Sequence, residues 1–124
     1  MIGKVYKSVV LYYDSKSQQT RTKTRPVLIV GGPRNNDYTV LPISTITLRK
    51  NLDPEFDILI DASSRSILNL PKECFIRTHK QMTVHRAELV SLYGDMKADI
   101  PDLYLDALVK MEGFQKRILA QSLS

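Results

Sequence analysis

The stretch from Lys23 to Thr45 constrains the fold most, because it predicts two paired strands. The apolar run Val27–Val30 is followed by the turn-forming cluster Gly31–Asp37, and a second run, Tyr38–Thr45, comes next. β-Branched runs on either side of glycine, proline and asparagine are the usual sequence signal for a hairpin. The sequence therefore predicts two antiparallel strands at the centre of the fold.

The polar ends of this hairpin carry a cation and two hydroxyl groups. Arg25 lies at the predicted start of one strand, and Ser44 and Thr45 lie at the predicted end of the other. Antiparallel pairing would bring them to the same edge. An arginine fork can bind phosphate through two parallel hydrogen bonds, and a hydroxyl can donate to another phosphate oxygen. Spacing alone favours the simpler alternative that these are ordinary strand-end residues.

Other short runs predict a mainly β fold. Val5–Tyr13 is rich in β-branched and aromatic residues and predicts the first strand, whereas Asp14–Thr24 has no apolar residue and predicts a long polar loop. Further strands are expected at Phe56–Ile60, Glu73–Thr78 and Met82–Val84, and one helical turn at Arg86–Val90. Five or six short strands joined by polar loops favour a small barrel or a strongly bent sheet.

The end of the chain predicts a helix from about Pro101 to Ser122. Its apolar positions, such as Leu105, Leu108 and Val109, follow helical rather than strand spacing. Asp99 is the expected N-cap. We expect this amphipathic helix to lie across the sheet, and we expect residues 1–124 to form a single domain.

The net charge of +5 is concentrated near the start of the chain. The first 25 residues contain six basic side chains and one acidic side chain, and the remaining 99 contain 12 of each. A local positive field of this kind attracts polyanions such as nucleic acids. A solvated basic loop that only aids solubility is the alternative, and composition does not decide between them.

Most metal and cofactor chemistries are disfavoured by residue type, so neither a metal nor a cofactor is predicted. The histidines His79 and His85 lack the spacing of a zinc motif, and no glycine-rich phosphate loop is present. The single cysteine, Cys74, is expected to be a buried structural thiol. The acid pairs Asp53/Glu55 and Asp57/Asp61 are interpreted as solvated surface.

Apolar runs in this sequence are all too short to cross a bilayer. The first residues also lack the apolar stretch of a signal peptide. The sequence therefore predicts a cytoplasmic protein with no membrane partner.

The order of these motifs resembles the MazF/PemK family of toxins from bacterial toxin-antitoxin systems. The segments that carry the resemblance are Gly3–Tyr6, Arg25–Val30, Val40–Thr45, Leu59–Asp61, Cys74–Ile76 and the segment ending at Leu89. The pairing of an Arg-Pro strand start with a Pro-apolar-Ser-Thr strand end is its most specific part. The resemblance covers nearly the whole chain.

This resemblance implies an SH3-like barrel that acts as a homodimer and is neutralised by a cognate antitoxin. The implied activity is metal-independent cleavage of single-stranded RNA, in which the RNA's own 2′-hydroxyl attacks the adjacent phosphate. It assigns catalytic roles to Arg25 and Ser44. The RNA-binding residues expected on this basis are Arg21, Lys23, Thr45, His79 and Lys80.

The chain departs from the family pattern just before Arg25. Many family members carry a glutamate and a glycine there, whereas Thr20–Thr24 contains neither. The family acid proposed as a proton acceptor therefore has no counterpart in this stretch, and His79 is a weaker candidate for that role. Two alternative functions use the same fold, namely a CcdB-like gyrase poison and a non-catalytic nucleic-acid-binding module. The first is disfavoured because that relative relies on tryptophan and this chain has none.

Overall fold

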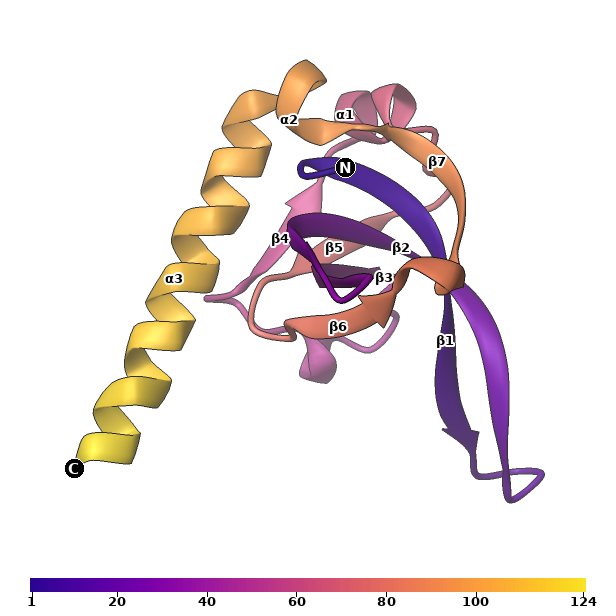
Figure 1. The fold of residues 1–124 in the computed structure, drawn as a ribbon, viewed down its shortest axis with the longest axis horizontal. Helices are drawn as coiled ribbons and strands as arrows, with labels where there is room; N and C mark the ends of the chain where they lie inside the picture. The colour runs from indigo at the N-terminus through magenta and orange to yellow at the C-terminus, as the bar shows by residue number, and fades with distance from the viewer.

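The computed structural model describes residues 1–124 and confirms a mainly β fold that ends in a long helix (Figure 1). Its elements are, in order, β1 (Lys4–Asp14), β2 (Gln19–Arg34), β3 (Asp37–Ser44), the 3₁₀ turn η1 (Arg49–Asn51), β4 (Asp57–Ile60), α1 (Ala62–Ile67), β5 (Cys74–Arg77), β6 (Met82–His85), the 3₁₀ turn η2 (Arg86–Glu88), β7 (Leu89–Asp95), α2 (Met96–Asp99) and α3 (Pro101–Leu123). There are seven strands rather than the five or six expected.

The strands form one curled antiparallel sheet, a half-barrel. The strand order is β4-β5-β3-β2-β1-β7, and β6 pairs with β3 beside β2. The central pair is the hairpin of β2 and β3, in which Val27 lies opposite Pro42 and Ile29 opposite Val40. The hairpin predicted from Lys23–Thr45 is thus confirmed as the middle of the sheet.

Alternation along β2 and β3 divides the core into two clusters. Leu28, Leu41 and Ile43 point into a large cluster that also contains side chains of α2 and α3. Val27 and Val40 point to the opposite face, into a smaller cluster that also contains Val84 of β6. Because the side-chain period of a strand is two residues, Arg25 and Ser44 continue the face of this smaller cluster.

The turn of the central hairpin is tighter than expected. β2 continues through Gly31 and Gly32 to Arg34, with two register irregularities. The turn itself is Asn35–Asn36, and both residues have positive φ (52° and 64°). Two residues in the left-handed region match the twist of the flanking strands, and asparagine tolerates this conformation better than most side chains.

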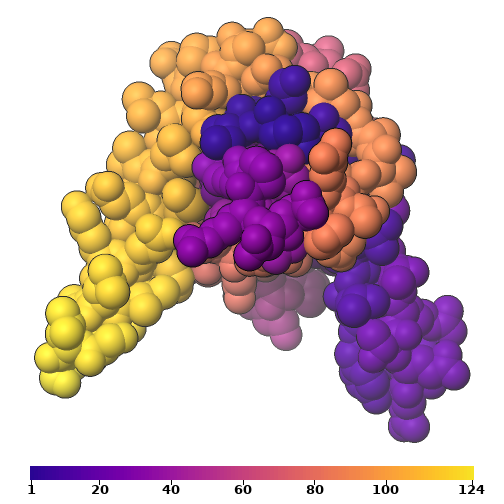
Figure 2. All heavy atoms as spheres, viewed as in Figure 1, coloured from indigo at the N-terminus to yellow at the C-terminus, as the bar shows by residue number.

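The prediction of a polar loop at Asp14–Thr24 is wrong, because most of this stretch is strand. β2 begins at Gln19 and pairs with β1 out to Asp14, so only residues 15–18 form the turn. Thr20, Thr22 and Thr24 alternate with basic residues, and β-branched threonine suits a strand. This ribbon protrudes from the body on the side away from α3, and we call residues 9–24 the arm (Figure 2).

Three further elements differ from the sequence-based expectations. The 3₁₀ turn at Arg86–Glu88 is shorter than the expected helical turn and leads directly into β7, which pairs with the start of β1. Helix α1, capped by Asp61, was not among the predicted elements. Asp99 is the last residue of α2 and not the N-cap of α3, which begins at Pro101 without a side-chain cap.

Helix α3 packs its first half on the body and extends past it at the C-terminal end (Figures 1 and 2). Its buried residues are Tyr104 and Ala107, and both belong to the large core cluster. None of the helices, the 23-residue α3 included, combines the length and the apolar character needed to cross a membrane.

Gly113 lies inside α3 with space around it. A Cβ atom built on this residue would meet nothing within 4 Å. We expect Gly113→Ala to raise the free energy of unfolding by up to about 1 kcal/mol, because alanine loses less backbone entropy in a helix than glycine does. Urea denaturation followed by circular dichroism measures this change. An unchanged denaturation midpoint would show that this part of α3 does not unfold together with the body, and a lower midpoint would contradict the prediction.

Candidate active site

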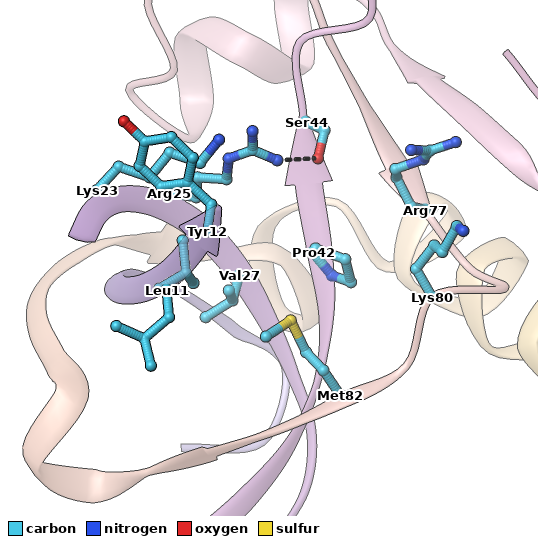
Figure 3. Close-up of a pocket in the computed structure, with 11 residues that line it drawn as sticks. Leu11, Tyr12, Lys23, Arg25, Val27, Pro42, Ser44, Arg77, Lys80 and Met82 are labelled. Atoms are coloured by element: carbon cyan, nitrogen blue, oxygen red, sulfur yellow. Dashed lines mark hydrogen bonds between the residues drawn. The ribbon is translucent and has the colours of Figure 1, made fainter. Parts of the chain in front are cut away.

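Arg25 and Ser44 lie side by side where β2 and β3 leave the small core cluster. Val27 and Pro42 are paired across the two strands, so Arg25 and Ser44 follow one step further out on the same face. The Arg25 Nη1 atom donates a hydrogen bond to the Ser44 Oγ atom over 3.2 Å (Figure 3). Ser44 is 7% exposed and Arg25 is half-buried. The predicted proximity of these two residues is confirmed.

A pocket of about 380 Å³ opens over this pair. It has an apolar floor, and four of its side chains are cationic, namely Lys23, Arg25, Arg77 and Lys80. No carboxylate and no histidine line it. Its other lining residues are Val10, Leu11, Tyr12, Val27, Pro42, Ser44 and Met82 (Figure 3). The charge and the apolar surface together suit a ligand that carries both an anion and a flat ring.

Lys23 and Tyr12 form the wall of the pocket on the arm. The Lys23 Nζ atom lies 4.3 Å from the centre of the Tyr12 ring, within the range of a cation–π contact. Burial, and after it the nearby Arg25 guanidinium, lower the pKa of the Lys23 ammonium group. Both causes disfavour a second positive charge here, so an anion bound in the pocket would relieve the repulsion between Lys23 and Arg25.

Arg77 lines the opposite wall, and sequence reasoning did not identify it. It lies at the end of β5, directly opposite Asp57 of β4. The Arg77 Nε and Nη2 atoms donate to the two oxygens of Asp57 over 3.1 and 3.3 Å, and the Asp57 side chain is fully buried. The interpretation of Asp57 as solvated surface is therefore wrong. The only sequence signal was the placement of an acid and a base in two strands that turn out to be paired.

Lys80 and Lys23 line the pocket as expected of RNA-binding candidates, but three other candidates lie elsewhere. Arg21 lies further along the arm on the same face as Lys23 and Arg25, with its Nε atom 3.3 Å from Asp14. Thr45 is exposed and faces a separate cavity beside Pro26 and Tyr93. Arg21 therefore extends the cationic face along the arm, whereas Thr45 does not belong to that face.

His79 packs under α3 instead of facing the pocket with Arg25. Its ring lies 6.0 Å from the ring of Phe56 and 5.9 Å from that of Phe114. The Nδ1 atom is 3.8 Å from a carboxylate oxygen of Asp57. The expectation that His79 lines the same site as Lys80 is therefore wrong, because the strand end turns the two neighbouring side chains to different sides.

Cys74 agrees with its interpretation as a structural thiol. The residue is 5% exposed and belongs to the large core cluster. Burial raises the pKa of its thiol, which keeps the sulfur protonated and unreactive. The described residues include no group of three or more histidine, cysteine, aspartate or glutamate side chains placed to hold a metal ion.

A curled antiparallel half-barrel with a long C-terminal helix, carrying a cationic pocket over an arginine–serine pair, defines a class of small, mainly β proteins. The sequence matches a family described as the PemK-like, MazF-like toxin of type II toxin-antitoxin systems over residues 8–111. The chain therefore belongs to this toxin family. No curated protein matches it. Membership implies that an antitoxin is its natural partner.

Proposed function

We propose that this toxin is an endoribonuclease that cleaves single-stranded RNA without a metal ion. The observation that carries the proposal is the hydrogen bond from Arg25 to Ser44 at the base of the cationic pocket. The toxin family is generally one of endoribonucleases. A phosphate with its neighbouring base has the combination of anion and flat ring that this pocket suits.

The proposed reaction is an internal transfer within the RNA. The 2′-oxygen attacks the adjacent phosphorus, a new O2′–P bond forms, and the P–O5′ bond breaks. The products are a 2′,3′-cyclic phosphate and a 5′-hydroxyl, and the proton lost from the 2′-oxygen is balanced by the proton gained at the 5′-oxygen. Charge accumulates on the non-bridging oxygens on the way, and this charge is what the pocket must stabilise.

Arg25 and Ser44 suit that task in complementary ways. Arg25 uses Nη1 for Ser44, so the other N–H groups of the guanidinium remain for a phosphate oxygen. Because the Ser44 oxygen accepts this bond, its own O–H is left to donate to a second oxygen. The contact thus holds the serine hydroxyl in the orientation that donation requires. Lys23 and Lys80 would bind the flanking RNA, and Tyr12 would stack on a base.

Two partners complete the proposal. The toxin would work as a homodimer, as the family resemblance implies, and a cognate antitoxin would neutralise it. Because cations line the pocket, an acidic antitoxin segment would compete with RNA for the same charges.

The decisive experiment is cleavage of a long single-stranded RNA by the purified chain in excess EDTA. We expect fragments that end in a 2′,3′-cyclic phosphate and begin with a 5′-hydroxyl, because the pocket supplies cations in place of a metal. End-group mapping with a kinase and a phosphatase identifies both ends. Intact RNA, or cleavage that appears only when a metal is added, would refute the proposal, and RNA binding without cleavage would indicate a binding module.

A further inference from the structure

Lys23 stands next to Arg25 on the face of β2 that opens into the pocket. Two residues of one strand that point to the same side are roughly 7 Å apart, and the four-carbon stem of a lysine spans a comparable length. Lys23 is half-buried, whereas Lys80 is exposed and lies across the pocket beside Arg77 (Figure 3). The bridging oxygens of a phosphate held by Arg25 are therefore within reach of the Lys23 ammonium group.

Strand β1 holds the Lys23 side chain in place. Lys23 lies opposite Val10, and Tyr12 is the next residue of β1 on the same face. The Nζ atom of Lys23 lies over the Tyr12 ring, 4.3 Å from its centre. An aromatic face attracts an ammonium group without accepting its proton, and the three N–H donors of a lysine leave some free for a ligand. Lys23 is thus positioned in the pocket with protons still available.

The reaction proposed above needs a proton donor for the leaving 5′-oxygen, because an alkoxide leaves poorly without a proton. No carboxylic acid and no histidine line the pocket. Its arginines do not release protons in proteins, and Ser44 is already assigned to a non-bridging oxygen. The lining side chains that remain are Lys23, Lys80 and Tyr12. Lys23 is the one that neighbours Arg25 on the same strand.

We propose that the Lys23 ammonium group is the general acid that protonates the leaving 5′-oxygen. This inference rests on the proposed ribonuclease function and adds a chemical step to the RNA contact given to Lys23 there. As the P–O5′ bond breaks, its electron pair passes to the 5′-oxygen, which takes a proton from Nζ. A water molecule takes the proton of the attacking 2′-hydroxyl, and the neutral amine regains a proton from solvent.

The surroundings of Lys23 favour this role. Burial, and after it the Arg25 guanidinium, lower the pKa of the Lys23 ammonium group, so its proton is released more readily than that of a solvated lysine. A bound phosphate has the opposite effect and keeps Lys23 protonated until negative charge reaches the 5′-oxygen. A general acid works best when its pKa approaches the operating pH, so a lowered lysine pKa strengthens catalysis.

The test uses an RNA in which sulfur replaces the bridging 5′-oxygen at one mapped cleavage site. A thiolate leaves without a proton, because thiols are far stronger acids than alcohols. Lys23→Arg keeps the positive charge but has no proton to release. We expect this variant to slow single-turnover cleavage of the unmodified RNA by about 10²-fold, the usual contribution of a general acid. Cleavage of the sulfur-substituted RNA should change by no more than a few-fold.

Control variants separate this role from binding and folding. Arg25→Ala should slow both RNAs to a similar extent, because charge builds on the non-bridging oxygens with either leaving atom. Lys80→Arg should keep the ratio of the two rates that the original chain shows. Circular dichroism checks that each variant is folded, and filter binding measures RNA affinity.

The possible outcomes distinguish this inference from the function on which it rests. If Lys23→Arg slows both RNAs equally, or slows neither, Lys23 is not the general acid. A loss confined to the unmodified RNA in Tyr12→Phe, and not in Lys23→Arg, would overturn the proposal in favour of the Tyr12 hydroxyl. An original chain that cleaves neither RNA would refute the ribonuclease function, and this inference with it.

Discussion

Replacing Arg25 with alanine is expected to slow RNA cleavage by about 10²- to 10³-fold, the usual loss when a preorganised donor to a developing oxyanion is removed. RNA binding should fall far less, because Lys23 and Lys80 remain in the pocket. Single-turnover rates on a short RNA with one cleavage site measure the effect. Arg34→Ala is the matched control, since Arg34 lies exposed at the far end of the same strand.

Further variants at positions 25 and 44 separate the contribution of the positive charge from that of the hydrogen-bond geometry. Arg25→Lys keeps the positive charge but loses the planar fork, so we expect it to recover only part of the lost rate. Ser44→Ala should cost on the order of 100-fold, as expected for one hydrogen bond made in the transition state. Full activity of Arg25→Ala would contradict the assignment, and full activity of Ser44→Ala would remove the serine from it.

Replacing Asp57 with alanine is expected to destabilise the fold by about 3 kcal/mol, in the range seen when one partner of a buried ion pair is removed. The Asp57 carboxylate is fully buried and accepts hydrogen bonds from Arg77 and from the backbone N–H of Asp53. Its loss leaves that N–H unpaired and leaves the Arg77 charge without its partner. Urea denaturation followed by circular dichroism measures the change in the free energy of unfolding.

A neighbouring acid provides the comparison for Asp57. Asp61 is exposed and caps α1 through a hydrogen bond from the backbone N–H of Ser64. Asp61→Ala should therefore cost about 1 kcal/mol, the usual value of a helix cap. Equal losses for the two variants would contradict the burial argument. RNA binding by Asp57→Ala provides a second measurement. Without its hydrogen bonds to Asp57, Arg77 can turn toward a ligand in the pocket.

The sequence was sufficient to predict the central hairpin and the meeting of Arg25 with Ser44. Both follow from local information, since β-branched runs and a short turn determine which residues pair. The arm was missed because its second strand is entirely polar. A two-stranded ribbon exposed on both faces shows no apolar alternation, and only the repeated threonines of Thr20–Thr24 indicated a strand.

The other wall of the pocket could not be predicted, because it depends on contacts between distant parts of the chain. Arg77 is placed by its pairing with Asp57, 20 residues away in sequence, and no local pattern specifies that pairing. His79 was assigned to the RNA-binding site because the family resemblance places positions that line the RNA groove near His79 and Lys80. The direction of each side chain depends on where β5 ends, and strand boundaries are the least reliable part of a sequence-based prediction.

The pairing of β1 with β7 also determines when the sheet can close during synthesis. Lys4 at the start of the chain lies opposite Asp95, so the last strand-to-strand contact waits until about three quarters of the protein has been made. Contacts between residues so far apart in sequence form slowly. A ribosome that stalls before β7 would carry a nascent chain with the backbone of β1 still open on one side. In such a chain every residue of the pocket has been synthesised, but the sheet that holds Arg25 is incomplete.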